Sequence, residues 1–308
     1  PRSFSDLDFV GKSIEIEEGE SILQASLRAG IPHTHVCGGK ARCTTCRILL
    51  IDGDENRLSP PGDEEYELVK KLGFAPNIRL ACQSYVRDDI KIRRLVIDDN
   101  DIDLAMLKRS DDTGKFSSTG VETRVAILFT DIRDFTSFSD NQLPYDIIHM
   151  LNRYICQMRL IIERNNGEVF NYMGDGLMAL FGVEKESWAI ENAVRSGMEM
   201  LEAMDNMQPY LQETYGQGLQ MGVGIHCGDV VIGSFEDSSN AMKMVIGDAV
   251  NFASRVESAN KETGTKLLVS QTVFDRLKEK IQIGKTCSVE LKGKSGEHQL
   301  YEVLSISD

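Results

Sequence analysis

The chain has 308 residues and carries 34 Lys and Arg against 48 Asp and Glu, a formal net charge of -14. This acidic balance argues against binding to nucleic acid or to an anionic membrane. No apolar run is long enough to span a bilayer and no signal peptide opens the chain, so we expect no membrane contact from these residues. Because the chain begins at Pro1 and not at methionine, excision from a longer, membrane-anchored protein stays open.

The first hundred residues predict a small mixed domain. Alternating apolar residues at 12–16 and an apolar run at 47–51 predict two strands. Ser21 and Gln24 have the spacing of a capping box, which predicts a helix running to about Ala29. The total length suits one domain here and a second domain after it.

Four of the seven cysteines carry a signal of their own. Five residues separate the first from the second, two separate the second from the third, and the fourth stands alone downstream; they are Cys37, Cys43, Cys46 and Cys82. Thiolate quartets of this kind hold [2Fe–2S] clusters. Structural zinc is the alternative, but zinc sites usually show two short cysteine pairs. The Gly38–Gly39 pair would let the loop wrap closely and aim backbone N–H groups at sulfur.

This spacing resembles that of adrenodoxin-like ferredoxins, since plant-type ferredoxins have one residue fewer in the first gap. Segment 79–83 resembles the strand that bears their last ligand. The resemblance implies a β-grasp [2Fe–2S] ferredoxin domain over residues 1–97, with the four cysteines as ligands. In those proteins an acidic helix at the place of 63–67 docks a basic redox partner, although a run of charge is also a common solvated face. Both interpretations of this segment stay open.

The other cysteines, Cys156, Cys227 and Cys287, have no ligand spacing, so we expect buried thiols. Together with the reducing chemistry that a cluster needs, they predict a cytoplasmic location. Residues 98–122 are polar and start with an acidic run, which predicts a linker between the two domains. Residues 103–109 within it could form one or two helical turns.

A second pattern of elements follows the linker. The apolar run 125–129 predicts a strand with Asp131 just past its end, where a following helix would direct the amides of Phe135 and Thr136 at an anion. Apolar residues at helical spacing then predict a long amphipathic helix over 145–164.

The remaining pattern predicts an α+β fold, with helices on one face of an antiparallel sheet. Strands at 168–172 and 177–181 are joined by a Gly-Asp-Gly turn that presents Asp175 at its tip. The later elements are a helix from Trp188 to about Met207, strands at 220–226, 230–235 and 242–245, a helix that Asp248 caps, a strand at 266–269, a helix at 271–280 that Ser270 caps, and strands at 287–292 and 299–304.

Two carboxylates and a distant Asn/Arg pair carry the chemistry. Asp131 and Asp175, at the ends of neighbouring strands, can hold a pair of Mg²⁺ or Mn²⁺ ions. Asn251 and Arg255 are four residues apart on one helix, so they share a face, and a guanidinium can neutralise charge that develops on a phosphate. An aspartate in such a turn is commonly only turn chemistry. The four residues together nevertheless predict a phosphoryl-transfer site.

These motifs, in this order, resemble the catalytic domain of class III nucleotidyl cyclases. The resemblance implies a ferredoxin-like βαββαβ catalytic domain within 123–308 that works as a head-to-tail homodimer. Each active site would take its aspartates from one subunit and its Asn/Arg pair from the other. The resemblance assigns Asp131, Asp175 and the carbonyl of Ile132 to the two metal ions.

The same resemblance gives roles to the residues that would touch the nucleotide. Asn251 would orient the ribose, and Arg255 would stabilise the transition-state phosphate. Either Lys292 or Lys294 would bind the terminal phosphates. The reaction implied is attack of the 3′ oxygen of a nucleoside triphosphate on its own α-phosphorus, which yields a 3′,5′-cyclic nucleotide and pyrophosphate.

The base is less well specified than the reaction. Family frequency favours ATP, and hence an adenylate cyclase. The positions that read the base in this class hold Asn171 and Met244, in place of the Lys with Asp or Thr of adenylyl cyclases or the Glu with Cys of guanylyl cyclases. Asparagine can donate or accept a hydrogen bond and methionine offers mainly shape, so a guanylate or dual-specificity cyclase stays open.

The joining of the two domains suggests a cyclase that responds to the redox state of its cluster. Residues 98–122 would transmit the change to the dimer, because small changes in subunit angle separate the two halves of each site. An alternative from a different class is an inactive nucleotide-binding sensor fused to an electron-transfer ferredoxin. Retention of the two aspartates and the Asn/Arg pair speaks against that alternative.

Overall fold

The computed structural model describes residues 2–6, 12–52, 55–96, 121–183, 188–237, 240–290 and 296–307. The chain divides into two compact units, and the boundary between them in the sequence falls at Glu122. Nearly all of the expected linker at 98–122, with its helical turns at 103–109, lies outside the described residues, as do Lys292 and Lys294. In the part of the chain that is described, no helix has the length and apolar character needed to cross a membrane.

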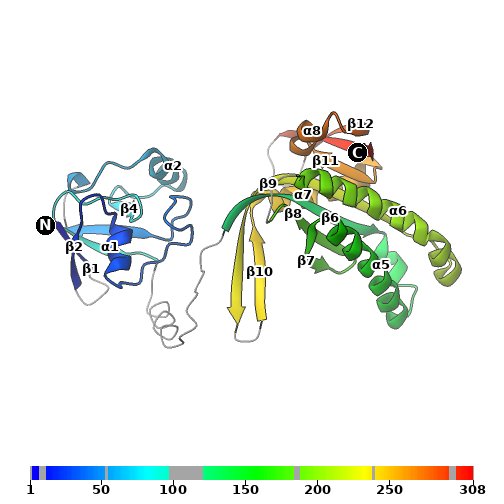
Figure 1. The fold of residues 1–308 in the computed structure, drawn as a ribbon, viewed down its shortest axis with the longest axis horizontal. Helices are drawn as coiled ribbons and strands as arrows, with labels where there is room; N and C mark the ends of the chain where they lie inside the picture. Colours follow the sequence, from blue (N-terminus) through cyan, green and yellow to red (C-terminus); the bar gives the residue numbers. More distant parts are fainter. Residues whose placement is uncertain are drawn as a thin grey trace. The chain divides into compact units, whose positions relative to one another are not determined.

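The first unit is a five-stranded sheet in the order β2-β1-β5-β3-β4 (Figure 1). Strands β1 and β5 run parallel, and the other neighbouring pairs run antiparallel. This is the predicted β-grasp arrangement. Its elements are β1 (Arg2–Asp6), β2 (Lys12–Ile16), α1 (Ile22–Arg28), β3 (Arg47–Asp52), a 3₁₀ turn (Glu55–Arg57), α2 (Asp63–Leu72), β4 (Ile78–Leu80) and β5 (Ile90–Arg94).

Helix α1 begins as its sequence predicts and closes the core of the first unit. The Ser21 amide donates to Gln24 Oε1 at 2.9 Å and the Gln24 amide donates to Ser21 Oγ at 3.3 Å, so the capping box is confirmed. Such a cap contributes on the order of 1 kcal/mol to helix stability. Ile22 of α1 packs with Ile48 and Leu80 of the sheet in one buried cluster. That cluster also includes Cys46 and Cys82, so the packed core reaches the cysteine-bearing loop.

The second unit is built on a sheet in the order β12-β13-β11-β9-β6-β8-β7, and β10 pairs with β9 (Figure 1). Strand β11 runs parallel to β9, whereas β6–β8, β7–β8, β11–β13 and β12–β13 are antiparallel. The strands are β6 (Val121–Arg133), β7 (Gly167–Met173), β8 (Gly176–Phe181), β9 (Gln220–Asp237), β10 (Asn240–Ile246), β11 (Leu267–Ser270), β12 (Ile281–Glu290) and β13 (Glu297–Ile306). The helices are α4 (Phe135–Ser139), α5 (Pro144–Arg164), α6 (Ala189–Tyr215), α7 (Asp248–Thr263) and α8 (Gln271–Leu277).

Alternate residues of β6 point to opposite faces of the sheet and pack against different helices. Ala126 and Leu128 belong to a large core shared with α5, α6 and α8, so the expectation of helices on one face is met by these three helices and not by α7. Ile127 points the other way, into a smaller cluster with Ala249 and Ala253 of α7. Helix α7 therefore lies on the opposite face from α5 and α6.

Two predicted strands, 220–226 and 230–235, are in fact the single strand β9. The sequence Cys-Gly-Asp at 227–229 reads as a turn, but its backbone is extended. A Cβ atom added to Gly228 would lie 2.6 Å from the Cβ of Ala249. This glycine therefore serves the close approach of α7 to β9, and not a reversal of the chain.

Helix α6 also differs from its prediction, because it runs to Tyr215 and not to about Met207. Pro209 lies inside the helix, where a proline usually costs a hydrogen bond. Buried Met204, Met207 and Leu211 continue the apolar stripe through this proline. Burial of that stripe outweighs the local cost.

Three further predictions are wrong in detail. Gly247 is the N-cap residue of α7, so Asp248 lies in the first turn and does not cap the helix. Ser270 does occupy the N-cap position of α8, but its side chain makes no capping hydrogen bond, and α8 ends at Leu277 and not at Lys280. Among the cysteines expected to be buried, Cys227 is buried and Cys287 half-buried, but Cys156 is exposed.

Candidate functional site

The two expected metal-binding aspartates meet where the C-terminal end of β6 lies beside the start of β8. Asp131 lies inside β6, which continues through Arg133, and not past the end of the strand as expected. Asp175 lies in the turn between β7 and β8, and the β6–β8 register pairs Thr130 with Leu177. The amide of Ile132 donates to Asp175 Oδ2 at 3.2 Å, which ties the turn to the strand.

The electrostatic environment of the two carboxylates favours a bound cation. Burial and the neighbouring Asp175 raise the pKa of Asp131 to about 6, and Lys261 only partly opposes this effect. Two carboxylates this close are stabilised by a hard divalent cation, so the donor set fits Mg²⁺ or Mn²⁺. No group of three or more Asp, Glu, His or Cys side chains gathers as a metal site in the described ranges. Carbonyl and substrate oxygens would have to complete the coordination.

The absence of a side chain at Gly176 allows the two aspartates to lie close together. A Cβ atom on Gly176 would lie 2.5 Å from the Thr130 carbonyl oxygen and 3.3 Å from Asp131 Oδ1. The Thr130 hydroxyl lies 3.4 Å from the hydroxyl of Tyr154, a fully buried residue of α5. The end of β6 is therefore fixed by the turn on one side and by the core on the other.

Helix α4 follows the aspartate strand at once. Phe135 and Thr136, expected to offer amides to an anion, are its first two residues, and first-turn amides have no acceptor inside a helix. Asp134 precedes them in the left-handed region, with φ 55°. Phe138, which is 1% exposed, anchors the helix in the core.

Helix α7 presents two different sets of polar residues on two faces. Asn251 is exposed and Arg255 half-buried. Glu257 and Lys261 lie about 120° further around the helix axis, at 100° per residue. This second face is the one beside the aspartates: burial and Asp131 raise the pKa of Glu257 to about 7. Sequence reasoning missed both residues, although their four-residue spacing marks a second polar face.

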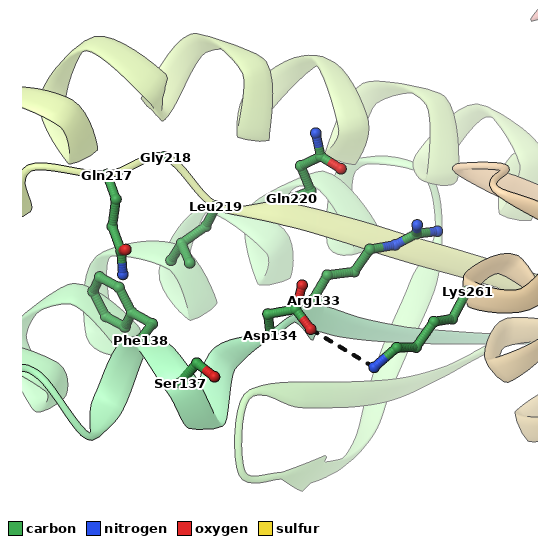
Figure 2. Close-up of a pocket in the computed structure, with 9 residues that line it drawn as sticks. All are labelled: Arg133, Asp134, Ser137, Phe138, Gln217, Gly218, Leu219, Gln220 and Lys261. Atoms are coloured by element: carbon green, nitrogen blue, oxygen red, sulfur yellow. Dashed lines mark ion pairs between the residues drawn. The ribbon is translucent and has the colours of Figure 1, made fainter.

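Figure 2 shows Lys261 reaching Asp134, with Nζ 3.6 Å from the carboxylate. A hollow of about 380 Å³ lies beside this pair, bordered by Arg133, by Ser137 of α4 and by Gln217 at the approach to β9. Arg133 donates to the carbonyl of Thr265, which fixes the position of the Arg133 side chain. The aspartate site is thus flanked by cations from its own chain.

The Asn/Arg pair stays apart from the aspartates. Across the described residues, no hydrogen bond or ion pair joins Asn251 or Arg255 to Asp131 or Asp175. Because the two sets of α7 residues lie on different faces, one helix cannot turn both toward the same aspartates. The structure therefore brings together only half of the four-residue constellation within one chain.

The two expected base-reading residues lie on separate strands. Asn171 is exposed on β7, opposite Met178, just after an irregularity in the β7–β8 register. Met244 is half-buried on β10. Strand β10 is tied to β7 by an ion pair between Lys243 Nζ and Glu168 Oε1 at 2.6 Å. The sequence did not signal this link between the strands.

In the first unit, the four cysteines of the spacing motif gather as two pairs. Cys46 Sγ lies 3.5 Å from Cys82 Sγ, and Cys37 hydrogen-bonds with Cys43. Two irons that share four thiolates need two thiolates each, so this pairing is compatible with a [2Fe–2S] cluster.

The surroundings of the thiols favour the thiolate form at two of them. A hydrogen bond from Cys46 lowers the pKa of Cys82 to about 6, while the same contact and burial raise the pKa of Cys46. Burial alone would raise the pKa of Cys43, but Thr45 and Cys37 lower it. The Thr45 hydroxyl lies 3.0 Å from Cys43 Sγ. Hydrogen bonds to sulfur of this kind also stabilise a bound cluster.

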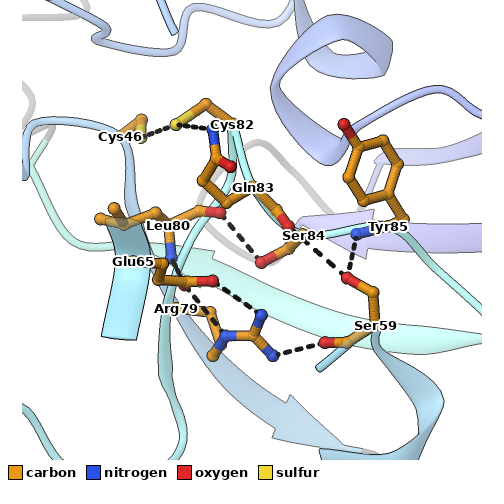
Figure 3. A network of polar contacts seen from close by, with 9 residues as sticks. All are labelled: Cys46, Ser59, Glu65, Arg79, Leu80, Cys82, Gln83, Ser84 and Tyr85. Carbon is orange, nitrogen blue, oxygen red and sulfur yellow. Dashed lines mark hydrogen bonds and ion pairs between the residues drawn. The ribbon is translucent and has the colours of Figure 1, made fainter. Parts of the chain in front are cut away.

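A buried ion pair ties helix α2 to β4, shortly before the last of these cysteines in the sequence (Figure 3). Glu65 is fully buried and accepts from Arg79 Nε at 3.0 Å and from Arg79 Nη2 at 2.8 Å. It also accepts from the Leu80 amide at 2.7 Å, two residues before Cys82. The acidic segment 63–67 is therefore not simply a solvated face, because one of its acids is an internal anchor.

Comparison with known proteins agrees with this geometry. Residues 119–305 match the adenylate and guanylate cyclase catalytic domain, and residues 6–87 match the 2Fe-2S iron-sulfur cluster binding domain. An adenylate cyclase of Anabaena cylindrica is 34% identical over 183 residues, which cover 58% of this chain and 36% of the relative. Adenylate cyclase 1 of Rhizobium meliloti is 26% identical over 203 residues, which cover 65% of this chain and 30% of the relative. The chain thus spans about a third of the length of these relatives.

Solved structures show the same fold in cyclases for both purine nucleotides. The guanylyl cyclase Cya2 superposes with a TM-score of 0.57 at 28% identity, covering 61% of this chain and 95% of that chain. The adenylyl cyclase CyaB from P. aeruginosa superposes with a TM-score of 0.55 at 26% identity, covering 60% of this chain and 95% of that chain. The 2Fe-2S domain match supports a [2Fe–2S] cluster, and the cyclase match implies the use of divalent metal. The catalytic-domain match covers more than half of the chain. The chain therefore belongs to the adenylate and guanylate cyclase catalytic domain family.

Proposed function

We propose that the protein is an adenylate cyclase, which converts ATP into 3′,5′-cyclic AMP and pyrophosphate. The observation that carries this proposal is the pair Asp131 and Asp175, held together by the Ile132 amide and by the absence of a side chain at Gly176. The curated relatives named above are adenylate cyclases, which favours ATP over GTP. The bond between the 3′ oxygen and the α-phosphorus forms, the bond from that phosphorus to the pyrophosphate oxygen breaks, and the 3′ proton passes to solvent.

Each residue of the site has a defined task in this reaction. Two Mg²⁺ or Mn²⁺ ions, held by Asp131, Asp175 and the Ile132 carbonyl, would favour the 3′ alkoxide and spread charge over the phosphates. The first-turn amides of α4, at Phe135 and Thr136, face the phosphates. Most of the rate enhancement then comes from positioning and electrostatics, because the protein forms no covalent bond to the substrate.

The active site is completed by a second copy of the chain. Asn251 and Arg255 lie on a different face of α7 from the residues that flank the aspartates, which supports their action on a partner's substrate. Asn251 orients the ribose and Arg255 stabilises the charge that develops at the transferring phosphorus. Lys292 or Lys294 binds the terminal phosphates. Asn171 and Met244 border the base.

The first unit holds a [2Fe–2S] cluster on Cys37, Cys43, Cys46 and Cys82. Their arrangement in two pairs supports this assignment. We take residues 1–97 as the ferredoxin domain, 98–122 as the segment that couples it to the cyclase, and 123–308 as the catalytic domain. The redox state of the cluster regulates the cyclase, and a redox partner exchanges electrons at the ferredoxin domain, within a cytoplasmic protein.

A product assay tests the proposed activity. The purified chain is incubated with ATP or GTP and Mg²⁺ or Mn²⁺, and cyclic nucleotide and pyrophosphate are quantified. We expect cyclic AMP as the main product and a loss of at least about 100-fold in Asp175→Asn. Asp205→Asn, an exposed aspartate of α6 paired with Lys266 at 3.5 Å, is the matched control and should retain activity. Wild-type turnover that yields no cyclic nucleotide, or an undiminished Asp175→Asn variant, would overturn the enzyme assignment; cyclic GMP as the main product would overturn only the choice of ATP.

A further inference from the structure

Phe252, which follows Asn251 on α7, contacts two histidine rings. Phe252 has its ring centroid 4.4 Å from that of His226 on β9, with 37° between the ring planes. His298 of β13 also contacts Phe252, in a T-shaped arrangement at 5.3 Å and 85°. Aromatic contacts of this kind each contribute about 0.5–1.5 kcal/mol and have preferred geometries. Phe252 therefore has a defined seat on the sheet.

His226 is itself held in place by its neighbours. Its Nδ1 lies 2.8 Å from the hydroxyl of Ser270. This contact accounts for the missing cap of α8, because the Ser270 hydroxyl is engaged by the imidazole ring and not by the first turn of the helix. On its other side the ring faces Gly228, where an added Cβ would lie 3.2 Å from His226 Nε2.

The height of α7 above the sheet is fixed separately. A Cβ atom on Gly224 would lie 2.1 Å from the backbone nitrogen of Glu257, so the helix rests directly on the β9 backbone. Further along the helix, the fully buried Asn260 donates from Nδ2 to the Val223 carbonyl at 2.9 Å, which ties the C-terminal half of α7 to β9. Near the start of α7, Phe252 with its two histidine contacts limits rotation of that part of the helix.

We propose that His226 is a positioning residue for the cyclase reaction. It acts through Phe252 to fix the rotation of α7, and so fixes the direction in which Asn251 and Arg255 leave the helix. The inference rests on the proposed function, in which these two residues act on the substrate. Rotation of α7 carries the Arg255 guanidinium along an arc, and a displacement of about 1 Å at a catalytic group can lower a rate about 100-fold.

Three substitutions separate positioning from simple stabilisation. His226→Ala removes both the ring contact and the Ser270 contact. His226→Phe keeps a ring against Phe252 and removes only the Ser270 contact. His149→Ala removes an exposed histidine of α5 and serves as the matched control. For each variant, kcat and KM for the nucleotide are measured together with the urea unfolding midpoint and with hydrogen exchange of the amides in 248–255.

We expect His226→Ala to lower kcat about 10- to 100-fold while KM stays within about threefold. Exchange should rise in 248–255 and not in the core strands, and His226→Phe should retain most of the wild-type rate. Phe252→Leu, which keeps apolar bulk but loses the ring stack, should show the same pattern if His226→Ala does not fold.

A kcat of His226→Ala within twofold of wild type would overturn the inference. Loss of rate in His226→Phe as large as in His226→Ala, with exchange raised throughout the unit, would also overturn it and leave His226 a structural residue. Should the wild type form no cyclic nucleotide, the proposed function fails. Hydrogen exchange then still decides whether His226 holds α7.

Discussion

Glu65 shows how a single charged residue can be misread from sequence. Its neighbours in the run 63–67 suggest a surface helix, yet Glu65 itself is fully buried with two contacts to Arg79 and one to the Leu80 amide. Removal of one partner from a buried ion pair leaves an uncompensated charge, at a cost of about 3–5 kcal/mol. This residue therefore links the helix to the Cys82 segment.

We predict that Glu65→Gln destabilises the ferredoxin unit by about 3–5 kcal/mol, since Arg79 would lose its counter-charge. Unfolding would be followed in urea, with the visible absorption of the cluster recorded in parallel. Glu64→Gln, an exposed neighbour on the same helix, should change stability by less than about 0.5 kcal/mol. Equal stability of the two variants would show that the ion pair contributes nothing that an amide cannot replace.

The site residues differ in whether the neighbouring sequence alone is enough to predict their role. Asp131 and Asp175 could be predicted because each belongs to a short motif next to a strand. Glu257 and Lys261 could not, because their importance depends on which face of α7 turns toward the aspartates. The same holds for Gly176 and Gly228. A glycine in a sequence suggests a turn, whereas a close approach becomes visible only once the neighbouring element is placed.

Among the elements, the start of helix α6 is joined to the segment between α8 and β12 by a polar cluster. Glu191 in the first turn of α6 accepts from Lys280 Nζ at 2.6 Å and from Arg195 at 3.1 Å. The hydrogen bond from Lys280 lowers the pKa of Glu191 below its usual 4.5. The carboxylate is mostly shielded from solvent, with 11% of its side chain exposed.

This contact predicts a defined pH dependence. A carboxylate whose pKa is lower in the folded than in the unfolded state contributes stability above the unfolded pKa, and that contribution is lost as the pH falls through the folded pKa. Glu191→Gln should therefore unfold about 1–2 kcal/mol more easily than wild type at pH 7, with Lys280 partly screened by solvent. The difference should shrink below about pH 4.5. Urea titrations from pH 7 to pH 3 measure it, and a difference independent of pH would contradict the ionic origin.

Regular elements follow their sequence patterns where packing is local. The stripe of helix α5 and the capping box of α1 needed no knowledge of the rest of the chain. Helix α6 is longer than predicted because buried residues beyond Pro209 hold its last turns. Strand β9 is continuous because the close approach of α7 requires an extended backbone at Gly228. In both cases tertiary packing overrode a local breaker.

At the scale of the whole molecule, the sequence joins a 2Fe-2S iron-sulfur cluster binding domain to a cyclase catalytic domain. One-electron reduction adds a negative charge at the cluster, and such a charge can shift an equilibrium only if two states of the dimer differ in their contact with it. We predict that turnover, measured anaerobically in the same preparation before and after reduction, changes by at least about fivefold. A variant with Cys82→Ser, which removes one proposed ligand, should lose the response. Equal rates in the oxidised and reduced states would make the cluster structural.

The central claim is that each active site is shared between two copies of the chain. Asp175→Asn and Asn251→Ala should each be nearly inactive alone, because every site in either homodimer lacks one half. Co-expression of the two variants should restore about one quarter of wild-type cyclic AMP formation, since half of the dimers are mixed and one of their two sites is intact. Mixed dimers that form but recover no activity would contradict the account.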